Sequence, residues 1–193
     1  MKIAYLLEST ILRAILTPYS VFLVGPFTIS VKKIEAALTA YRIASEKRKK
    51  LKLIRISPVD TRMEEDRLIK KPAHAYHINI PPEQVAQLFR SQNGILLSSS
   101  SPGEGFGLPA LEAMACAVPT VLTSIPSYKN FSSPQDYAVF VPVDDPEAMA
   151  QALMELMDNR DKKKYLIKRG LDVAAQYSYE KVAEKMEILL KNE

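Results

Sequence analysis

The chain has 193 residues, of which 47% are hydrophobic and 25% charged, and its formal net charge is +4. This composition is typical of an ordinary globular protein, long enough for one large or two small domains. The single cysteine, Cys116, excludes an intrachain disulfide framework and is typical of a reducing compartment. No apolar run is long enough to span a bilayer, and the run at residues 3–7 stops at Glu8, too short for a signal peptide. We therefore expect a cytoplasmic protein.

Much of the positive charge lies in two basic runs, at residues 47–50 and 162–164. Aromatic residues, on which nucleic-acid bases would stack, are not interleaved with either run. We therefore interpret both runs as solvated helix ends and expect no nucleic acid among the partners. A peripheral contact of these runs with a membrane surface stays open.

Residues 1–18 form a leader that differs from the rest of the chain. Residues 1–7 predict a buried strand, and residues 11–16 predict an apolar helical turn that Pro18 ends. Neither segment has an obvious partner nearby in the sequence. We expect the apolar side chains of the leader to pack on the following domain or on a second copy of the chain, as a homodimer. These side chains are Ile11, Leu12, Ile15 and Leu16.

From Tyr19 onward, short apolar strands alternate regularly with helical patterns. Strands are expected at residues 20–24, 51–56, 75–80, 94–97, 120–123 and 137–141. Helices are expected at residues 32–47, 62–71, 83–90, from 108 onward, at 146–157, and twice more before the end. This alternation predicts an α/β fold with a doubly wound, parallel, Rossmann-like sheet, built as one domain over residues 19–193. Ligands of such sheets bind beyond the carboxyl ends of the strands.

The stretch at residues 98–114 carries the strongest functional signal. It leaves a strand, passes through a loop with three glycines in five positions, and enters a helix near Leu108. Glycines allow a ligand to approach the backbone closely, and the free N–H groups of a helix start favour an anion. Two carboxylates, Glu104 and Glu112, bracket this turn. A carboxylate beside a phosphate would repel it, so Glu104 is better suited to sugar hydroxyls or a developing positive centre.

The run Glu104-Gly-Phe-Gly-Leu-Pro-Ala-Leu-Glu112-Ala-Met-Ala resembles the donor-binding signature of retaining GT-B glycosyltransferases, the glycosyl transferases group 1 family. These enzymes move a sugar from a nucleotide diphosphate. The resemblance extends over residues 19–193, with two weaker matches around Gly25 to Leu38 and Val139 to Ala148. It implies a carboxy-terminal, donor-binding domain, which is one half of a GT-B fold.

The resemblance also implies a role for each matching residue. Glu112 is expected to receive the ribose hydroxyls of the nucleotide, and Glu104 to act as the catalytic carboxylate near the donor sugar. The glycine-rich loop, with backbone N–H groups facing the sugar and the diphosphate, comprises Gly105, Phe106, Gly107 and Leu108. Lys32 is expected to counter the diphosphate charge in the loop that begins at Gly25. The backbone of Ile80 is expected near the base.

The implied reaction is a retaining sugar transfer that needs no metal and no cofactor beyond the nucleotide-sugar donor. Preorganised cations and a helix start can stabilise the charge that accumulates on the leaving diphosphate. We find no Asp-x-Asp pair in a metal-binding context. Asp144-Asp145 adjoins a proline and is interpreted as the start of a helix.

The sequence also departs from the family pattern. Pro26 stands where the family has an arginine, so one diphosphate cation is missing unless Lys33, at a family glycine position, replaces it. Residues 125–128 replace a common Gly-Gly pair. The amino-terminal half, which holds the acceptor and often a catalytic histidine, has no counterpart beyond the leader; His74 and His77 are assigned structural or surface roles. The acceptor, whether sugar, lipid or glycan, stays unidentified, and a non-catalytic nucleotide-sugar-binding or interaction module of the same fold is the alternative function.

Overall fold

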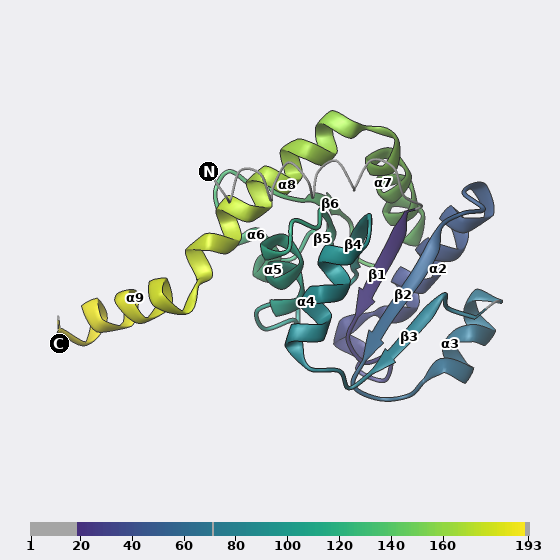
Figure 1. Ribbon diagram of the computed structural model, residues 1–193, viewed down its shortest axis with the longest axis horizontal. Coiled ribbons are helices and arrows are strands. Elements are labelled where there is room, and N and C mark those ends of the chain that lie inside the picture. The colour runs from purple at the N-terminus through teal and green to yellow at the C-terminus, as the bar shows by residue number, and fades with distance from the viewer. Residues whose placement is uncertain (1–18, 71, 192–193) are drawn as a thin grey trace.

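The computed structural model describes residues 19–70 and 72–191, and these form a six-stranded parallel sheet covered by helices on both faces (Figure 1). The strand order is β3-β2-β1-β4-β5-β6, and all five neighbouring pairs are parallel. The strands are β1 (Ser20–Val24), β2 (Lys52–Ser57), β3 (Ala75–Ile78), β4 (Gly94–Ser98), β5 (Thr120–Thr123) and β6 (Val139–Val141). The predicted doubly wound α/β class is confirmed.

The helices follow the strands in near-regular alternation. They are α2 (Ile34–Lys47), α3 (Arg62–Ile69), α4 (Pro82–Ser91), α5 (Leu108–Ala115), α6 (Pro126–Lys129), α7 (Pro146–Asp158), α8 (Arg160–Ala174) and α9 (Tyr179–Lys191). Two short 3₁₀ turns lie at Ser30–Lys32 and Ala175–Tyr177. No helix within residues 19–70 and 72–191 is both long enough and apolar enough to cross a membrane.

Both faces of the sheet are buried because side chains alternate along each strand. Val21 and Leu23 of β1 point into one core with α2 and α7, whereas Phe22 points into the other with α4 and α5. The Phe22 ring packs edge-on against Phe89 of α4 at a centroid distance of 4.9 Å. This double burial explains why the strands are continuous apolar runs rather than alternating apolar and polar residues.

The strand order reverses direction at β1, which pairs with β2 on one side and with β4 on the other. The chain connections run outward from this point to both edges of the sheet. The loop after β1 and the loop after β4 therefore emerge side by side at the carboxyl edge of the sheet. This is the position at which doubly wound folds bind ligands.

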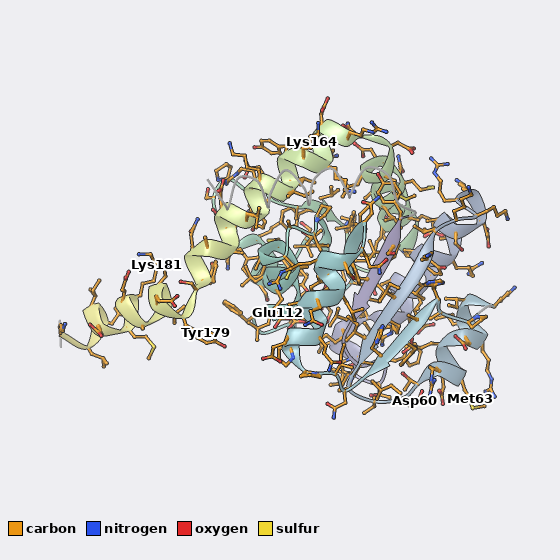
Figure 2. The ribbon with its side chains drawn as sticks, viewed as in Figure 1. Asp60, Met63, Glu112, Lys164, Tyr179 and Lys181 are labelled. Carbon is orange, nitrogen blue, oxygen red and sulfur yellow. The ribbon has the colours of Figure 1, made fainter. Side chains whose placement is uncertain are left out.

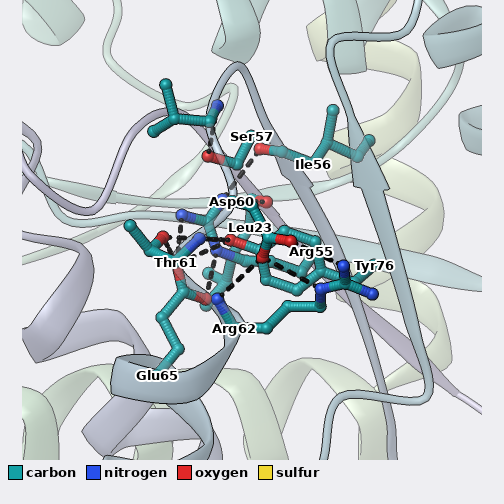
Figure 3. A network of polar contacts seen from close by, with 10 residues as sticks. Leu23, Arg55, Ile56, Ser57, Asp60, Thr61, Arg62, Glu65 and Tyr76 are labelled. Carbon is teal, nitrogen blue, oxygen red and sulfur yellow. Dashed lines mark hydrogen bonds and ion pairs between the residues drawn. The ribbon is translucent and has the colours of Figure 1, made fainter.

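A buried ion pair joins α3 to β2, the neighbour of β3 in the sheet (Figure 3). Arg55 of β2 and Glu65 of α3 are 0% and 2% exposed, and two hydrogen bonds of 2.8 and 2.9 Å join them. Arg55 also donates to the carbonyls of Leu23 and Ile56, while Thr61 and Tyr76 donate to the Glu65 carboxylate. The desolvated charges are thus fully paired, as burial requires.

Several element boundaries differ from the sequence prediction. The helix expected from residue 32 begins at Ile34, after the 3₁₀ turn and Lys33. The stretch between the strands predicted at residues 120–123 and 137–141, where no helix is predicted, contains the short helix α6, with Pro126 in its first turn. Asp145 accepts a hydrogen bond from the Ala148 N–H at 2.8 Å, which confirms the helix start predicted there. The predicted leader and its dimer contact lie outside the described residues.

Helix α9 projects away from the rest of the domain (Figure 1). No residue of α9 is buried, although several of its side chains are large and apolar. Its predicted apolar positions, Val182, Met186 and Leu189, are 40%, 57% and 69% exposed. The helical pattern was therefore correct, but α9 covers no core among the described residues.

Candidate functional site

The loops after β1 and β4 are joined by hydrogen bonds at the carboxyl edge of the sheet. The Ser101 N–H donates to the Val31 carbonyl at 2.8 Å. The Ser99 hydroxyl lies 3.0 Å from the carbonyl of Lys32 and 2.6 Å from that of Lys33, just before α2 begins. Two loops about 70 residues apart in sequence therefore form one surface between α2 and α5.

An ion pair between Lys32 and Glu104 lies at the centre of this surface. The Lys32 ammonium is 2.6 Å from a Glu104 carboxylate oxygen, and the two side chains are 22% and 9% exposed. The stem of Lys32 runs past Gly25, where an added Cβ atom would lie 3.6 Å from it. Gly25 also has a φ of +124°, which L side chains rarely adopt. The structure thus brings together three residues that the sequence assigned separately to the donor site.

Further hydrogen bonds hold the Glu104 carboxylate. The Ser100 hydroxyl donates to the same carboxylate oxygen at 2.8 Å. Burial alone raises the pKa of Glu104, but the hydrogen bonds from Lys32 and Ser100 and the Lys32 charge outweigh it, so the pKa lies below its usual value. Glu104 is therefore ionised at neutral pH.

Tyr128 of α6 holds the loop after β4 in place through its hydroxyl group. The tyrosine is 1% exposed, and its hydroxyl lies 2.6 Å from the Ser98 hydroxyl and 3.0 Å from that of Ser100. The Ser127 hydroxyl donates to the Glu104 carbonyl, and the Thr123 hydroxyl donates to the Ser100 carbonyl at 2.5 Å. Sequence reasoning noted residues 125–128 only as a departure from the family. The sequence signal for these contacts was the presence of two polar side chains, Ser127 and Tyr128, shortly after a short apolar strand.

Helix α5 begins directly at this loop. Gly107, its N-cap, has a φ of +83°, and Pro109 lies in the first turn, where no N–H is needed. The start of α5 therefore presents backbone N–H groups and the positive end of its dipole to the carboxyl edge. Leu108 is 58% exposed there, and a Cβ atom at Gly105 would meet nothing within 4 Å.

Glu112 lies in the second turn of α5 and is exposed (Figure 2). Partial burial of its carboxyl group raises its pKa. No hydrogen bond or ion pair to another described residue occupies this carboxylate. It is therefore available to hydroxyl donors from a ligand.

Phe106 is 47% exposed at the tip of the loop. Its ring packs edge-on against Phe131 and Tyr177 at centroid distances of 5.9 and 5.7 Å. Tyr177 in turn donates to the Phe131 carbonyl at 2.9 Å. These aromatic contacts join the loop to the segments after α6 and α8, and they limit the positions that Phe106 can take.

Two predicted site residues lie apart from the Lys32–Glu104 pair. The Lys33 ammonium is 3.2 Å from a carboxylate oxygen of Asp144, and both side chains are exposed. Lys33 has a φ of +48°, so it adopts at the family's glycine position the left-handed conformation that glycine favours. Ile80 is half-buried after β3, near the start of α4. Within residues 19–70 and 72–191, no three His, Cys, Asp or Glu side chains are grouped so that they could hold a metal ion.

The structure is that of a doubly wound α/β protein whose candidate ligand site lies at the point where its strand order reverses. The family model of the glycosyl transferases group 1 matches residues 15–173. The chain belongs to this family.

The sequence relatives include a D-inositol 3-phosphate glycosyltransferase of Corynebacterium urealyticum, 30% identical over 106 residues. The match covers 55% of this chain and 24% of that protein. Other curated relatives are matched over similarly small shares of their length, 28% and 26% in two further cases. The matched region thus spans about a quarter of these relatives.

Solved structures support the same fold. Sucrose-phosphate synthase from Thermosynechococcus elongatus superposes with a TM-score of 0.77 at 23% identity, over 98% of this chain and 48% of that chain. The pneumococcal O-GlcNAc transferase GtfA, solved with UDP and GlcNAc, superposes with a TM-score of 0.70 at 17% identity, over 91% of this chain and 36% of that chain. These likenesses show a Rossmann-like domain that matches part of GT-B glycosyltransferase structures.

Proposed function

We propose that this domain binds a nucleotide-diphosphate sugar at the carboxyl edge between β1 and β4 and serves as the donor half of a retaining, metal-independent glycosyltransferase. The observation that carries this proposal is the joining of Lys32, Glu104 and the start of α5 at one surface. A cation and free backbone N–H groups suit a diphosphate, and an adjacent ionised carboxylate suits a sugar. UDP in the structure of a similar transferase supports the same ligand class.

The nucleotide is expected to lie along α5, with its diphosphate at the helix start. Glu112 is one turn further along the helix and has no protein partner among the described residues, so it can accept two hydrogen bonds from ribose hydroxyls. Ile80, at the carboxyl end of β3, would face the base through its backbone. Gly105, whose Cβ position is open, leaves room for the sugar beside the loop.

In the proposed reaction, the bond between the anomeric carbon and the diphosphate oxygen breaks, and its electron pair stays with the diphosphate. The acceptor hydroxyl oxygen bonds to the anomeric carbon, and its proton passes to the leaving diphosphate. Lys32 and the start of α5 stabilise this growing negative charge, with no metal ion required. The ionised Glu104 carboxylate contacts the sugar hydroxyls or stabilises the positive charge that develops at the anomeric carbon. The lowered pKa of Glu104 suits this role, because it keeps the carboxylate charged at neutral pH when the donor arrives.

Donor binding requires a change in the Lys32–Glu104 pair. The Lys32 ammonium already contacts Glu104, so it must be shared with the incoming diphosphate or transferred to it. Lysine suits such an exchange, because its ammonium is a compact charge on a flexible stem. The acceptor, a sugar, lipid or glycan hydroxyl, is expected to be bound by a second domain.

A non-catalytic nucleotide-sugar-binding module of the same fold is the second candidate function. Two observations favour it: Pro26 replaces the family arginine, and Lys33, the substitute cation, is paired with Asp144 instead. The two functions share the binding site and differ only in turnover.

The experiment is a calorimetric panel of nucleoside diphosphates and nucleotide sugars, followed by a transfer assay with the whole protein and an acceptor panel. Saturable binding of one donor class is expected in both cases. Sugar transfer that is abolished by Glu104→Gln would establish the glycosyltransferase function. Donor binding with neither sugar transfer nor donor hydrolysis would favour the non-catalytic binding module. A chain that binds no nucleotide of the panel would contradict both.

A further inference from the structure

The basic run at residues 47–50 borders a hollow at the amino edge of the sheet. It is therefore more than a solvated helix end. The hollow has a volume of about 560 Å³ and lies where α2 ends and where β2 and β3 begin. Lys49, Lys50, Lys52 and His74 contribute to its lining. Pro72, which is exposed, and Ala73, which is half-buried, supply apolar surface to it.

A second hollow of about 390 Å³ adjoins the first and shares Lys49, Lys50 and Leu51 with it. This second hollow is also lined by Lys47 and Arg48. Five cationic side chains within six sequence positions therefore border one continuous depression.

The charge of these lysines is largely uncompensated. No described residue that lines either hollow is acidic. Arg48 pairs with Asp158 at 2.6 Å, but no carboxylate among residues 19–70 and 72–191 pairs with Lys47, Lys49, Lys50 or Lys52. Some surface lysines elsewhere are paired: Lys162 contacts Glu155 and Lys181 contacts Glu184, each at 2.8 Å.

The dipole of α2 can stabilise only one of these lysines. A cation in the last turn of a helix is stabilised by the negative end of the helix dipole, and Lys47 occupies that position in α2. The dipole effect falls off within one turn. Lys49, Lys50 and Lys52 lie beyond the end of α2, so their mutual repulsion is not offset in this way.

We propose that this hollow binds a phosphate-bearing anion, either a free phosphate compound or the headgroup of an anionic lipid. Lysine ammonium groups bind phosphate oxygens by charge-assisted hydrogen bonds, and the apolar surface from Pro72 and Ala73 can contact the carbon part of such a ligand. The site differs from the donor site, because it lies at the amino ends of β2 and β3, whereas the donor loops follow the carboxyl ends of β1 and β4. Strands of this length separate the two edges by about 17–20 Å.

The test uses the full chain and two kinds of probe. Inorganic phosphate and pyrophosphate are titrated while backbone amide NMR shifts are followed, and sedimentation measures binding to vesicles of equimolar phosphatidylcholine and phosphatidylglycerol. Saturable shifts at residues 49–52 and 73–74 support a free phosphate ligand, whether or not residues 103–108 of the proposed donor site also shift. Binding to these vesicles, but not to pure phosphatidylcholine, supports a lipid headgroup.

The test variant combines Lys49→Ala, Lys50→Ala and Lys52→Ala, and the matched control combines Lys162→Ala, Lys164→Ala and Lys168→Ala on α8, where Figure 2 marks Lys164. Both change the net charge equally at surface positions. We expect the test variant to lose the phosphate shifts, or to lower vesicle partitioning about 100-fold, while the control retains most binding.

Two results would overturn the proposal: no binding of either probe by the parent chain, or equal losses in both variants. Thermal unfolding of both variants checks that each remains folded.

Discussion

The Tyr128 ring occupies the space that a side chain at position 107 would need: a Cβ atom built on Gly107 would lie 2.2 Å from Cε1 of Tyr128. The hydroxyl group of the same tyrosine contacts the hydroxyls of Ser98 and Ser100, and the Ser100 hydroxyl donates to the Glu104 carboxylate. Tyr128 thus connects the end of β4, the Glu104 carboxylate and the start of α5. The close approach of the Tyr128 ring gives the glycine-rich loop a single position.

Gly107→Ala is expected to destabilise the protein. The added methyl group would overlap the buried Tyr128 ring, and alanine would have to adopt a φ of +83°. Backbone strain and overpacking together should lower the free energy of unfolding by about 2–4 kcal/mol. Urea unfolding measures this change. Gly105→Ala is the matched control, because nothing lies within 4 Å of its Cβ position, and an equal loss there would contradict the explanation.

Lys32→Met is expected to raise the pKa of Glu104. The substitution removes the ammonium that lowers this pKa and leaves the burial that raises it. The folded-state pKa of Glu104 is below its usual value of 4.5. Glu104 therefore stabilises the parent fully above pH 4.5, and this contribution is lost as the pH falls through the folded-state pKa. The variant should lose this contribution. Carboxyl ¹³C NMR titration follows Glu104 directly, and an unchanged midpoint would show that the ion pair is absent in solution.

Arg55→Met is expected to cost about 3–5 kcal/mol of unfolding free energy, because it leaves the Glu65 carboxylate buried without a countercharge. Replacing both partners, Arg55→Met with Glu65→Met, should recover much of this loss, since no lone charge stays buried. Asp60→Ala, which breaks the exposed pair with Arg62, serves as the surface control and should change stability little. Equal losses for the buried and exposed pairs would contradict the role assigned to Arg55.

Lys32→Ala is expected to weaken binding of a nucleoside diphosphate far more than binding of the corresponding nucleoside. Only the diphosphate presents the anion that Lys32 would neutralise. Calorimetry with both ligands measures the difference, and Lys33→Ala is the neighbouring control, since Lys33 contacts Asp144. Equal losses for the two ligands would remove Lys32 from the diphosphate site.

Much of the fold could be predicted from the sequence, because both faces of the sheet are buried and the strands are continuous apolar runs. The strands around Phe22 and Leu96 and the loop into α5 were found in this way. The exposed position of α9 could not be predicted, because an amphipathic pattern does not reveal which surface it covers.

The contacts of the site were harder to predict than its residues. Glu104 and Lys32 were each assigned to the donor site, but they are 72 positions apart, and their ion pair depends on the pairing of β1 with β4. Tyr128 was missed for the same reason, since its partners Ser98 and Ser100 precede it by about 30 residues. Arg55 lies in a buried strand whose partner carboxylate is on α3, and periodicity alone does not identify such a pair.

The most direct test of the proposed donor site is a calorimetric titration of the parent chain and of Glu112→Ala with a nucleoside diphosphate. Two charge-assisted hydrogen bonds from ribose hydroxyls should contribute roughly 2–4 kcal/mol, so the substitution should weaken binding about 30-fold or more. Glu147→Ala, an exposed carboxylate in the first turn of α7, is the control and should bind as the parent does. Equal affinities of the parent and Glu112→Ala would contradict the assignment of this helix to the nucleotide.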